Sequence, residues 1–186
     1  MRTAGPDSHL VHVWSLRVRL FHWALATSVA GAWLLSEDVR WLHEYAGYAA
    51  ATLVAGRVLF GFVGTGHERF ASFVQGPRAT LVYLGDIARR RERRHLGHNP
   101  AGGVMIVGLL CAIALIVLTG WMMTTDTFWG DERVEAIHKL LADGLVLLVI
   151  LHVSGVLVAS LSHRENLVRA MVTGWKRPNA DNERVH

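Results

Sequence analysis

Apolar residues in this chain are gathered into four long blocks, where a soluble domain would spread them as the stripes of amphipathic helices. The blocks cover residues 18–35, 43–63, 103–123 and 138–161. A helix needs about 20 residues to cross a hydrocarbon core of about 30 Å, and each block is close to that length. Backbone polar groups must pair internally within a bilayer, so the blocks are expected to be helices. The pattern predicts an all-α fold, an integral membrane four-helix bundle.

The first block could also be interpreted as the apolar core of a cleaved signal peptide, because Arg17 and Arg19 lie at its start. However, no small-x-small cleavage site follows the block, and three further blocks come after it. We therefore interpret it as a span. Residues 1–177 are expected to form one membrane domain, and residues 178–186 a disordered tail.

Positive charge is unevenly distributed between the connections. Lys and Arg number 19 against 15 Asp and Glu, which gives a formal net charge of +4. Arginine is concentrated in the N-terminal segment, in the long connection after the second block and in the tail, whereas the two other connections hold only Arg40 and Arg133 among acidic residues. By the positive-inside rule, both termini and the long connection are cytoplasmic. We therefore attribute the excess of basic residues to the orientation of the protein in the membrane, and we expect no nucleic-acid partner.

Three segments outside the blocks have patterns of their own. Residues 1–16 resemble a short polar lead-in, and residues 78–84 and 165–175 are each expected to contain a short helix along the inner membrane surface. The arginine run at residues 89–94 is interpreted as a topology signal beside anionic headgroups, in preference to a protein-docking patch.

Four of the eleven histidines lie within or at the start of the apolar blocks: His22, His43, His138 and His152. Ionisable residues in spans usually face the bundle interior or a cavity, and neutral imidazole is a common metal ligand. A fifth histidine, His98, precedes the third block, where it could cap that helix or touch the edge of a cofactor; its role is left open.

The depth of each of the four histidines follows from the topology. His152 lies 14 residues after His138, which places it about 21 Å deeper and within about 40° of the same helix face. The first block runs outward, so His22 matches the inner depth of His152. The second block runs inward, so His43 matches the outer depth of His138. The sequence therefore predicts two transverse histidine pairs.

Two imidazoles on facing helices can occupy both axial positions of a haem iron. A zinc site requires four ligands, or three and a water, at one depth, and a di-iron carboxylate bundle requires inward glutamates. The single cysteine, Cys111, belongs to no Cys-x-x-Cys-His motif, so covalent c-type attachment is excluded. The pairs therefore predict b-type haem, with His22 and His152 at the inner site and His43 and His138 at the outer site.

Several cations are candidates to contact the haem propionates. Arg57 lies deep in the second block at the depth of the inner pair, and a buried cation needs a partner. An inner propionate would serve through bidentate contacts, although the side chain could instead snorkel to the headgroups. Arg17 and Arg19 are further candidates at the inner site, and Lys139 and Arg133 at the outer site.

Ordered motifs along most of the chain resemble the bacterial cytochrome b561 and nickel-iron hydrogenase cytochrome b subunit superfamily. They are residues 13–23 (VWSLRVRLFHW), 43–48 (HEYAGY), 56–57 (GR), 96–100 (LGHNP) and 163–167 (HRENL). The resemblance implies four helices in the bacterial inner membrane and two b haems per chain. It carries over the same ligand pairs, His22 with His152 and His43 with His138, and implies quinone, for example ubiquinone, as a redox partner.

The resembling proteins include membrane anchors of hydrogenases and other respiratory enzymes, oxidases of superoxide that reduce ubiquinone, and partners of periplasmic c-type cytochromes. We therefore expect a di-haem cytochrome that carries electrons between the quinone pool and a c-type cytochrome or a dehydrogenase or hydrogenase subunit. It would act as an electron-transfer protein or as a subunit of an oxidoreductase. The alternatives are a superoxide:ubiquinone oxidoreductase and a non-redox transporter whose histidines relay protons. Membrane lipid is an expected partner, and self-association is an open option.

Overall fold

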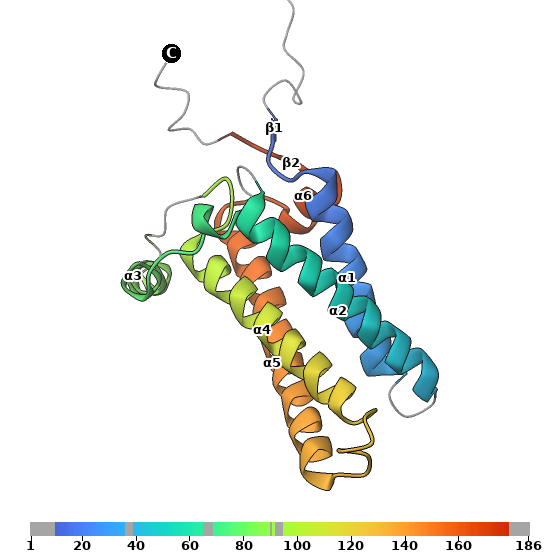
Figure 1. The fold of residues 1–186 in the computed structure, drawn as a ribbon. Helices are drawn as coiled ribbons and strands as arrows, with labels where there is room; N and C mark the ends of the chain where they lie inside the picture. The colour runs from blue at the N-terminus through green and yellow to red at the C-terminus, as the bar shows by residue number, and fades with distance from the viewer. Residues whose placement is uncertain (1–9, 36–38, 65–68, 90, 92–94, 179–186) are drawn as a thin grey trace, which may run out of the picture.

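The computed structural model describes residues 10–35, 39–64, 69–89, 91 and 95–178, and most of that part is helical (Figure 1). The helices are α1 (Leu16–Leu34), α2 (Arg40–Val63), α3 (Pro77–Ala88), α4 (Pro100–Met122), α5 (Glu132–Ser162) and α6 (Leu167–Thr173). A 3₁₀ turn, η2 (Phe70–Ser72), and the strands β1 (Val11–His12) and β2 (Trp175–Lys176) complete the described elements. The four apolar blocks coincide with α1, α2, α4 and α5, which confirms the helical interpretation of the pattern.

Polar side chains determine where most of these helices begin. The caps of α1, α4, α5 and α6 accept hydrogen bonds from backbone N–H groups of the first turn; they are Ser15, Asn99, Asp131 and Asn166. Because Asp131 caps a polar first turn, α5 begins at Glu132, six residues before the apolar block. The resulting helix is 31 residues long and extends past both ends of that block.

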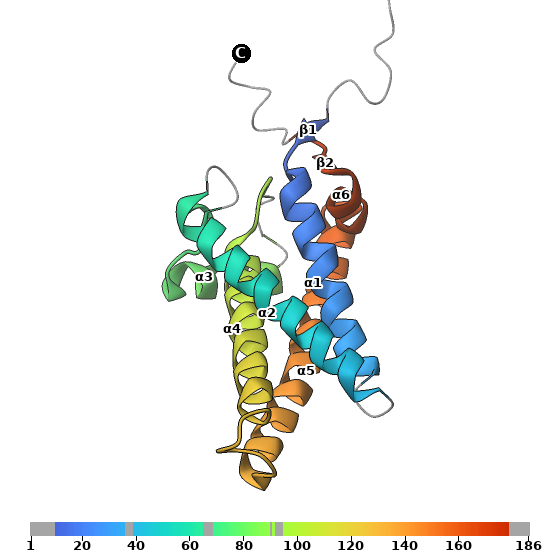
Figure 2. The ribbon, with the colours of Figure 1, turned by 45° about the vertical axis from the view of Figure 1, so that its right-hand side comes forward.

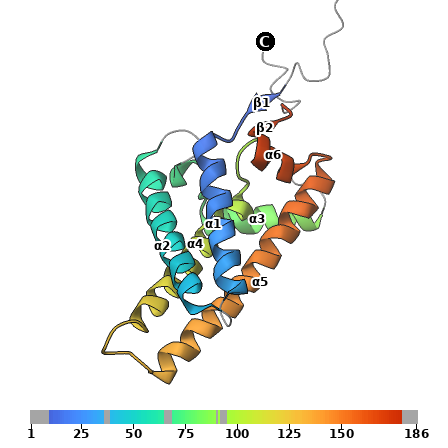
Figure 3. The ribbon, with the colours of Figure 1, turned by 90° about the vertical axis from the view of Figure 1, so that its right-hand side faces the viewer.

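The long helices pack in the order α1, α2, α4, α5. Figures 2 and 3 show α1 lying along α2, and α4 along α5. Helix α3 packs on α4 and lies across the others; in Figure 1 it is seen nearly end-on. We call the end of the molecule that carries β1, β2 and α6 the terminal end. The opposite end, where α1 leads to α2 and α4 leads to α5, is the hairpin end (Figure 1).

Three described helices are long and apolar enough to cross a membrane: α2, α4 and α5. The sequence pattern predicted four. Helix α1 is not among the three because Arg17, Arg19 and His22 lower the mean hydropathy of its 19 residues. It nevertheless packs along α2, so its neighbour in the structure is one of the membrane-length helices.

The long helices expose a largely apolar surface. Only 6% of the most apolar window of α5 is buried, and Leu140 and Leu161 are 71% and 80% exposed. Contiguous exposed apolar surface of this kind marks a protein or membrane contact. Helices of membrane length that are apolar all round are typical of spans.

The buried core between the long helices is small and aliphatic. It consists of Ala50 and Val54 on α2, Leu110 and Ile113 on α4, and Leu145 on α5. Partly buried side chains of α1, including Leu25 and Val29, pack against it. This core joins all four long helices near the middle of their length.

A second cluster closes the terminal end. The strands β1 and β2 pair antiparallel, with Val11 opposite Lys176, so the two ends of the described chain lie together. Val13 and Trp14 are buried with Ala170 of α6. The prediction of a polar lead-in over residues 1–16 is therefore wrong for Val13 and Trp14, because the pairing of the strands brings them against Ala170. Residues 1–9 lie outside the described part.

The segment 163–167 makes the corner between α5 and α6. Arg164 has a φ of 49°, in the left-handed region that reverses the chain direction. The Glu165 carboxylate accepts a hydrogen bond from the backbone N–H of Arg177 (3.0 Å), and Ser160 Oγ accepts one from Leu167 N (3.3 Å). The short helix predicted within residues 165–175 is present as α6.

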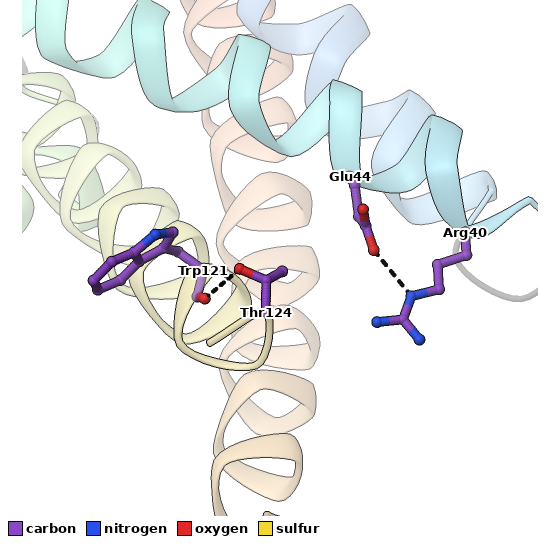
Figure 4. Close-up of polar contacts among 4 residues, drawn as sticks. All are labelled: Arg40, Glu44, Trp121 and Thr124. Atoms are coloured by element: carbon purple, nitrogen blue, oxygen red, sulfur yellow. Dashed lines mark hydrogen bonds and ion pairs between the residues drawn. The ribbon is translucent and has the colours of Figure 1, made fainter. Parts of the chain in front are cut away.

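The hairpin end is joined by contacts between α2 and the connection that follows α4. Arg40 forms an ion pair with Glu44 one turn later (2.9 Å; Figure 4). Its guanidinium also lies 5.1 Å from the Trp129 ring centroid. Thr124 Oγ donates to the Trp121 carbonyl (2.8 Å) where α4 ends. Exposed ion pairs contribute little stability, so these contacts orient the connection more than they stabilise it.

Helix α3 corresponds to the short helix predicted within residues 78–84, and it extends over Pro77–Ala88. Thr80 and Tyr83 are buried, whereas Leu81 and Val82 are exposed. Four residues of the arginine run, 90 and 92–94, and residues 179–186 of the predicted disordered tail lie outside the described residues.

The contact between η2 and α4 leads to a test of the fold. A Cβ atom added at Gly103 would lie 2.5 Å from the carbonyl oxygen of Phe73. Gly103→Ala should therefore force η2 away from α4 and cost about 1–3 kcal/mol, as overpacking does. Thermal unfolding in detergent should show a lower midpoint, by about 2–4 °C per kcal/mol.

The matched control is Gly108→Ala on the same helix, where an added Cβ meets nothing within 4 Å. It should leave the midpoint unchanged or raise it, because alanine favours the helix over glycine. Equal midpoints for the two variants would contradict the close approach of η2.

Candidate metal centres

The structure brings the four candidate histidines together as two facing pairs. His22 of α1 faces His152 of α5, with ring centroids 6.4 Å apart and planes inclined at 47°. His43 of α2 faces His138 of α5, with centroids 6.2 Å apart and planes at 73°. All four side chains are half-buried. Within the described residues, no group of three or more His, Cys, Asp or Glu side chains could hold a metal ion.

The spacing of each pair fits one metal ion between two imidazole nitrogens. A metal–imidazole bond of about 2.0–2.1 Å, plus about 1.1 Å from nitrogen to ring centroid on each side, gives about 6.3 Å between centroids. The observed separations are 6.4 and 6.2 Å. Each pair would therefore have the spacing to hold a metal such as a haem iron between its two rings.

The two pairs lie at opposite ends of one helix, with aliphatic side chains between them. Leu145, in the core between the long helices, is seven residues from His138 and seven from His152. Seven residues of α-helix bring the chain back to within about 20° of the same face. On α2, Ala50 lies seven residues after His43 and belongs to the same core. The core therefore separates the two pairs along the bundle.

Hydrogen bonds at the hairpin end orient the rings. His43 Nδ1 lies 2.8 Å from the Ala32 carbonyl of α1. A carbonyl only accepts, so Nδ1 carries the proton and Nε2 keeps the lone pair that a metal requires. His138 Nδ1 lies 2.9 Å from Thr119 Oγ of α4. Sequence patterns gave no sign of either partner.

The pair at the terminal end is built differently. His22 Nδ1 is buried and has no hydrogen-bond partner among the described residues. A buried polar nitrogen without a partner is costly in an apolar bundle. The chemistry of the donor set, two neutral imidazoles facing each other, is again suited to a metal between them.

The candidate cations lie in several places. The Arg57 guanidinium lies 5.0 Å from the Phe70 ring centroid and 5.8 Å from that of Phe73, over the η2 segment. Arg19 donates from Nη1 to the Val172 carbonyl and so joins α1 to α6. Arg17 is exposed on the first turn of α1. Arg57 therefore contacts aromatic rings, and Arg19 already has a structural partner.

The two cations predicted for the outer site lie on the first two turns of α5. The side chains of Arg133 and Lys139 are both exposed. Lys139 directly follows His138, so it is at the depth of the hairpin-end pair. Any contact of these cations with a haem propionate stays a prediction.

His98 does not cap α4. The cap is Asn99, whose Oδ1 accepts from the backbone N–H of Gly102 (2.7 Å). The His98 ring lies between aromatic rings, with centroid separations of 4.6 Å to Trp14 and 4.8 Å to Phe73. Lys176, which is 6% exposed, places its ammonium over the Trp14 ring, 5.8 Å from the ring centroid. No sequence pattern indicates this position of Lys176, because the pairing of β2 with β1 brings it there.

The fold and the histidine pairs together define a class: a helical protein with membrane-length helices and transverse imidazole pairs. A family model described as prokaryotic cytochrome b561 matches residues 13–174, nearly the whole chain. The chain belongs to the prokaryotic cytochrome b561 family. Family membership and the three apolar helices make it a multi-pass membrane protein of electron transfer, with b-type haem as the implied cofactor.

Curated relatives match at low identity over most of their length. A protein of Azotobacter vinelandii named probable Ni/Fe-hydrogenase B-type cytochrome subunit is 25% identical and covers 89% of this chain and 88% of its own length. Proteins of the same name from Cupriavidus necator and Bradyrhizobium diazoefficiens are 23% and 22% identical, over 93% and 90% of this chain and 89% and 86% of their own. No solved structure matches the chain significantly. These findings confirm the family resemblance and favour a redox role over a non-redox transporter.

Proposed function

We propose that this protein is a membrane-embedded di-haem b-type cytochrome, with His22 and His152 as one axial pair and His43 and His138 as the other. The observation that carries the proposal is the spacing of the facing rings, 6.4 and 6.2 Å between centroids. When bound, b-type haem supplies one-electron chemistry at its iron.

The protein's own residues fix the ligands and exclude water. Helix α5 provides one histidine to each pair, so the separation of the two sites is set by one rigid element. Leu145, Leu110 and Ile113 fill the space between the pairs. The Ala32 carbonyl holds His43 in the Nδ1–H form, which leaves Nε2 as the ligand atom.

Cations near the ends of the bundle would receive the propionates. At the terminal end, Arg57 is our first candidate, with Arg17 and Arg19 beside α1; at the hairpin end, the candidates are Lys139 and Arg133. Arginine suits this role because its guanidinium makes bidentate contacts with carboxylates. The aromatic contacts of Arg57 support it as a fixed cation.

We infer that α1, α2, α4 and α5 all span the bacterial inner membrane, with both termini in the cytoplasm. The pairing of β1 with β2 supports this, because it requires the two ends of the chain to lie on one side. The arginine-rich connection also begins and ends at the terminal end (Figure 1).

Within this topology the protein would carry electrons between the quinone pool and a redox partner. The names of the relatives support a nickel-iron hydrogenase as that partner. The hydrogenase would dock at the hairpin end. A dehydrogenase subunit or a periplasmic c-type cytochrome would meet the same surface. The acidic residues near that surface include Asp126, Glu132 and Glu135.

The ligand assignment is tested with single substitutions on α5. His152→Ala and His138→Ala should each lose one of two b haems, because each removes one ligand of a different pair. Haem per chain, measured by pyridine haemochrome, should fall from about two to about one, as expected for a loss of one bis-histidine site.

The matched control is His163→Ala, at the end of the same helix and outside both pairs. It should retain both haems. Loss of both haems in each of the two ligand variants would contradict separate pairing. A wild-type protein without b-type absorption bands would overturn the proposed function itself.

The topology is tested by labelling single cysteines in intact cells, after Cys111→Ser removes the native thiol. An Asp126→Cys variant should react with a membrane-impermeant maleimide from the periplasm. An Arg78→Cys variant should react only after the cells are opened, since the positive-inside rule places α3 in the cytoplasm. The reverse pattern would contradict the orientation.

The redox role is tested with the purified protein in liposomes. Quinol should reduce the haems, and a hydrogenase from the same organism should do so in the presence of hydrogen. Superoxide-driven quinone reduction at a comparable rate would favour the alternative, a superoxide:ubiquinone oxidoreductase.

A further inference from the structure

Helix α4 carries no histidine, yet it touches one of the four. Thr119, which is 9% exposed, places its Oγ 2.9 Å from His138 Nδ1. The same oxygen lies 3.0 Å from the carbonyl oxygens of Leu115 and Ile116 in the preceding turn. The hydroxyl therefore connects the backbone of α4 to the imidazole.

The direction of each hydrogen bond follows from the chemistry of the partners. Carbonyls only accept, so the Thr119 hydroxyl donates its one proton to the preceding turn. Its lone pairs are then left to accept from the Nδ1–H of His138. Donation to a carbonyl polarises the hydroxyl and strengthens it as an acceptor. This arrangement favours the Nδ1–H tautomer of His138, which would leave the Nε2 lone pair for a metal.

The next residue, Gly120, shapes the space for the same ring. An added Cβ would lie 3.2 Å from His138 Cε1 and 3.7 Å from Nδ1. The first separation is tighter than ordinary van der Waals contact, so a side chain here would push the ring. Gly120 therefore leaves room for the close approach of the imidazole.

We propose that Thr119 and Gly120 form a positioning element for His138, which makes the hairpin-end ligand a stronger electron donor to its metal. This inference rests on the proposed function. Hydrogen bonding from the distal nitrogen raises the basicity of a ligating imidazole and stabilises the oxidised iron. The terminal-end pair lacks this element at His22, whose Nδ1 has no hydrogen-bond partner in the described part. The two sites are therefore tuned differently.

The first experiment uses Thr119→Val, which keeps the shape and removes the hydroxyl. In a redox titration of the holoprotein, one of the two haem components should move to a higher midpoint potential, and the other should stay unchanged. The component that moves should be the one absent from His138→Ala. The substitution leaves the His138 imidazole in place, so the expected effect is a shift of the potential and not a loss of the haem.

Two controls separate this role from a merely structural one. Thr119→Ser restores the hydroxyl and should return the potential towards the wild-type value. Thr52→Val removes a threonine whose hydroxyl donates to the carbonyl four residues earlier, in the same way, but whose side chain is exposed. It should leave both potentials unchanged.

A second variant tests the space around the ring. Gly120→Ala should rotate or displace His138, alter the low-spin ferric electron paramagnetic resonance signal of the same haem, and weaken its retention by up to about tenfold. Gly108→Ala on the same helix, with nothing within 4 Å of the added Cβ, should leave both signals unchanged.

The outcomes distinguish this inference from the function on which it rests. If the wild-type protein binds two b haems but Thr119→Val and Gly120→Ala leave both components unchanged, the inference is overturned and the proposed function stands. If the wild-type protein binds no haem, the proposed function is overturned. Nitrogen-15 NMR of the apoprotein then decides the inference: His138 should be the Nδ1–H tautomer in the wild type and lose that preference in Thr119→Val, and an unchanged tautomer would overturn it.

Discussion

The arrangement of this protein depends on one helix that faces two different partners. Helix α5 is 31 residues long and places His138 opposite α2 and His152 opposite α1. A rise of about 1.5 Å per residue separates the two histidines by about 21 Å, and fourteen residues return nearly to the same face. For both rings to meet a partner, α1 and α2 must lie side by side along that face. Their antiparallel packing and the aliphatic core centred on Leu145 provide this.

The two ends of the bundle stabilise this arrangement in different ways. At the terminal end, paired strands and the buried Trp14 join the start of α1 to the chain after α6. At the hairpin end, the Ala32 carbonyl and the Thr119 hydroxyl restrain the rings of the two candidate ligands, His43 and His138. A metal held between imidazoles requires fixed rings, because a ligand that rotates loses both distance and orientation. The terminal end restrains the backbone, and the hairpin end restrains the side chains.

The helices and the depths of the histidines could be predicted from the sequence, whereas the contacts around the histidines could not. The helices followed from apolar length, and the histidine pairs followed from depth, because helical rise is constant whatever the neighbours. Contacts between side chains depend on how each helix is rotated about its axis and on which helices are neighbours. The length of an apolar block determines neither. Arg57 illustrates this limit: its depth was predicted, but its contact with Phe70 and Phe73 depends on the path of the chain after α2. His98 illustrates the same limit, because the side-chain oxygen of the neighbouring Asn99 accepts the capping hydrogen bond instead.

The sequence by itself determined that this chain forms membrane-length helices and that four histidines fall at two depths. These properties are local, since they depend on the hydropathy of consecutive residues and on the geometry of a single helix. Only the tertiary structure decided which helix packs beside which, that Thr119 and Gly120 adjoin His138, and that Lys176 returns to cover Trp14. Those contacts join residues far apart in the chain, and the packing of whole helices and paired strands is what brings them together.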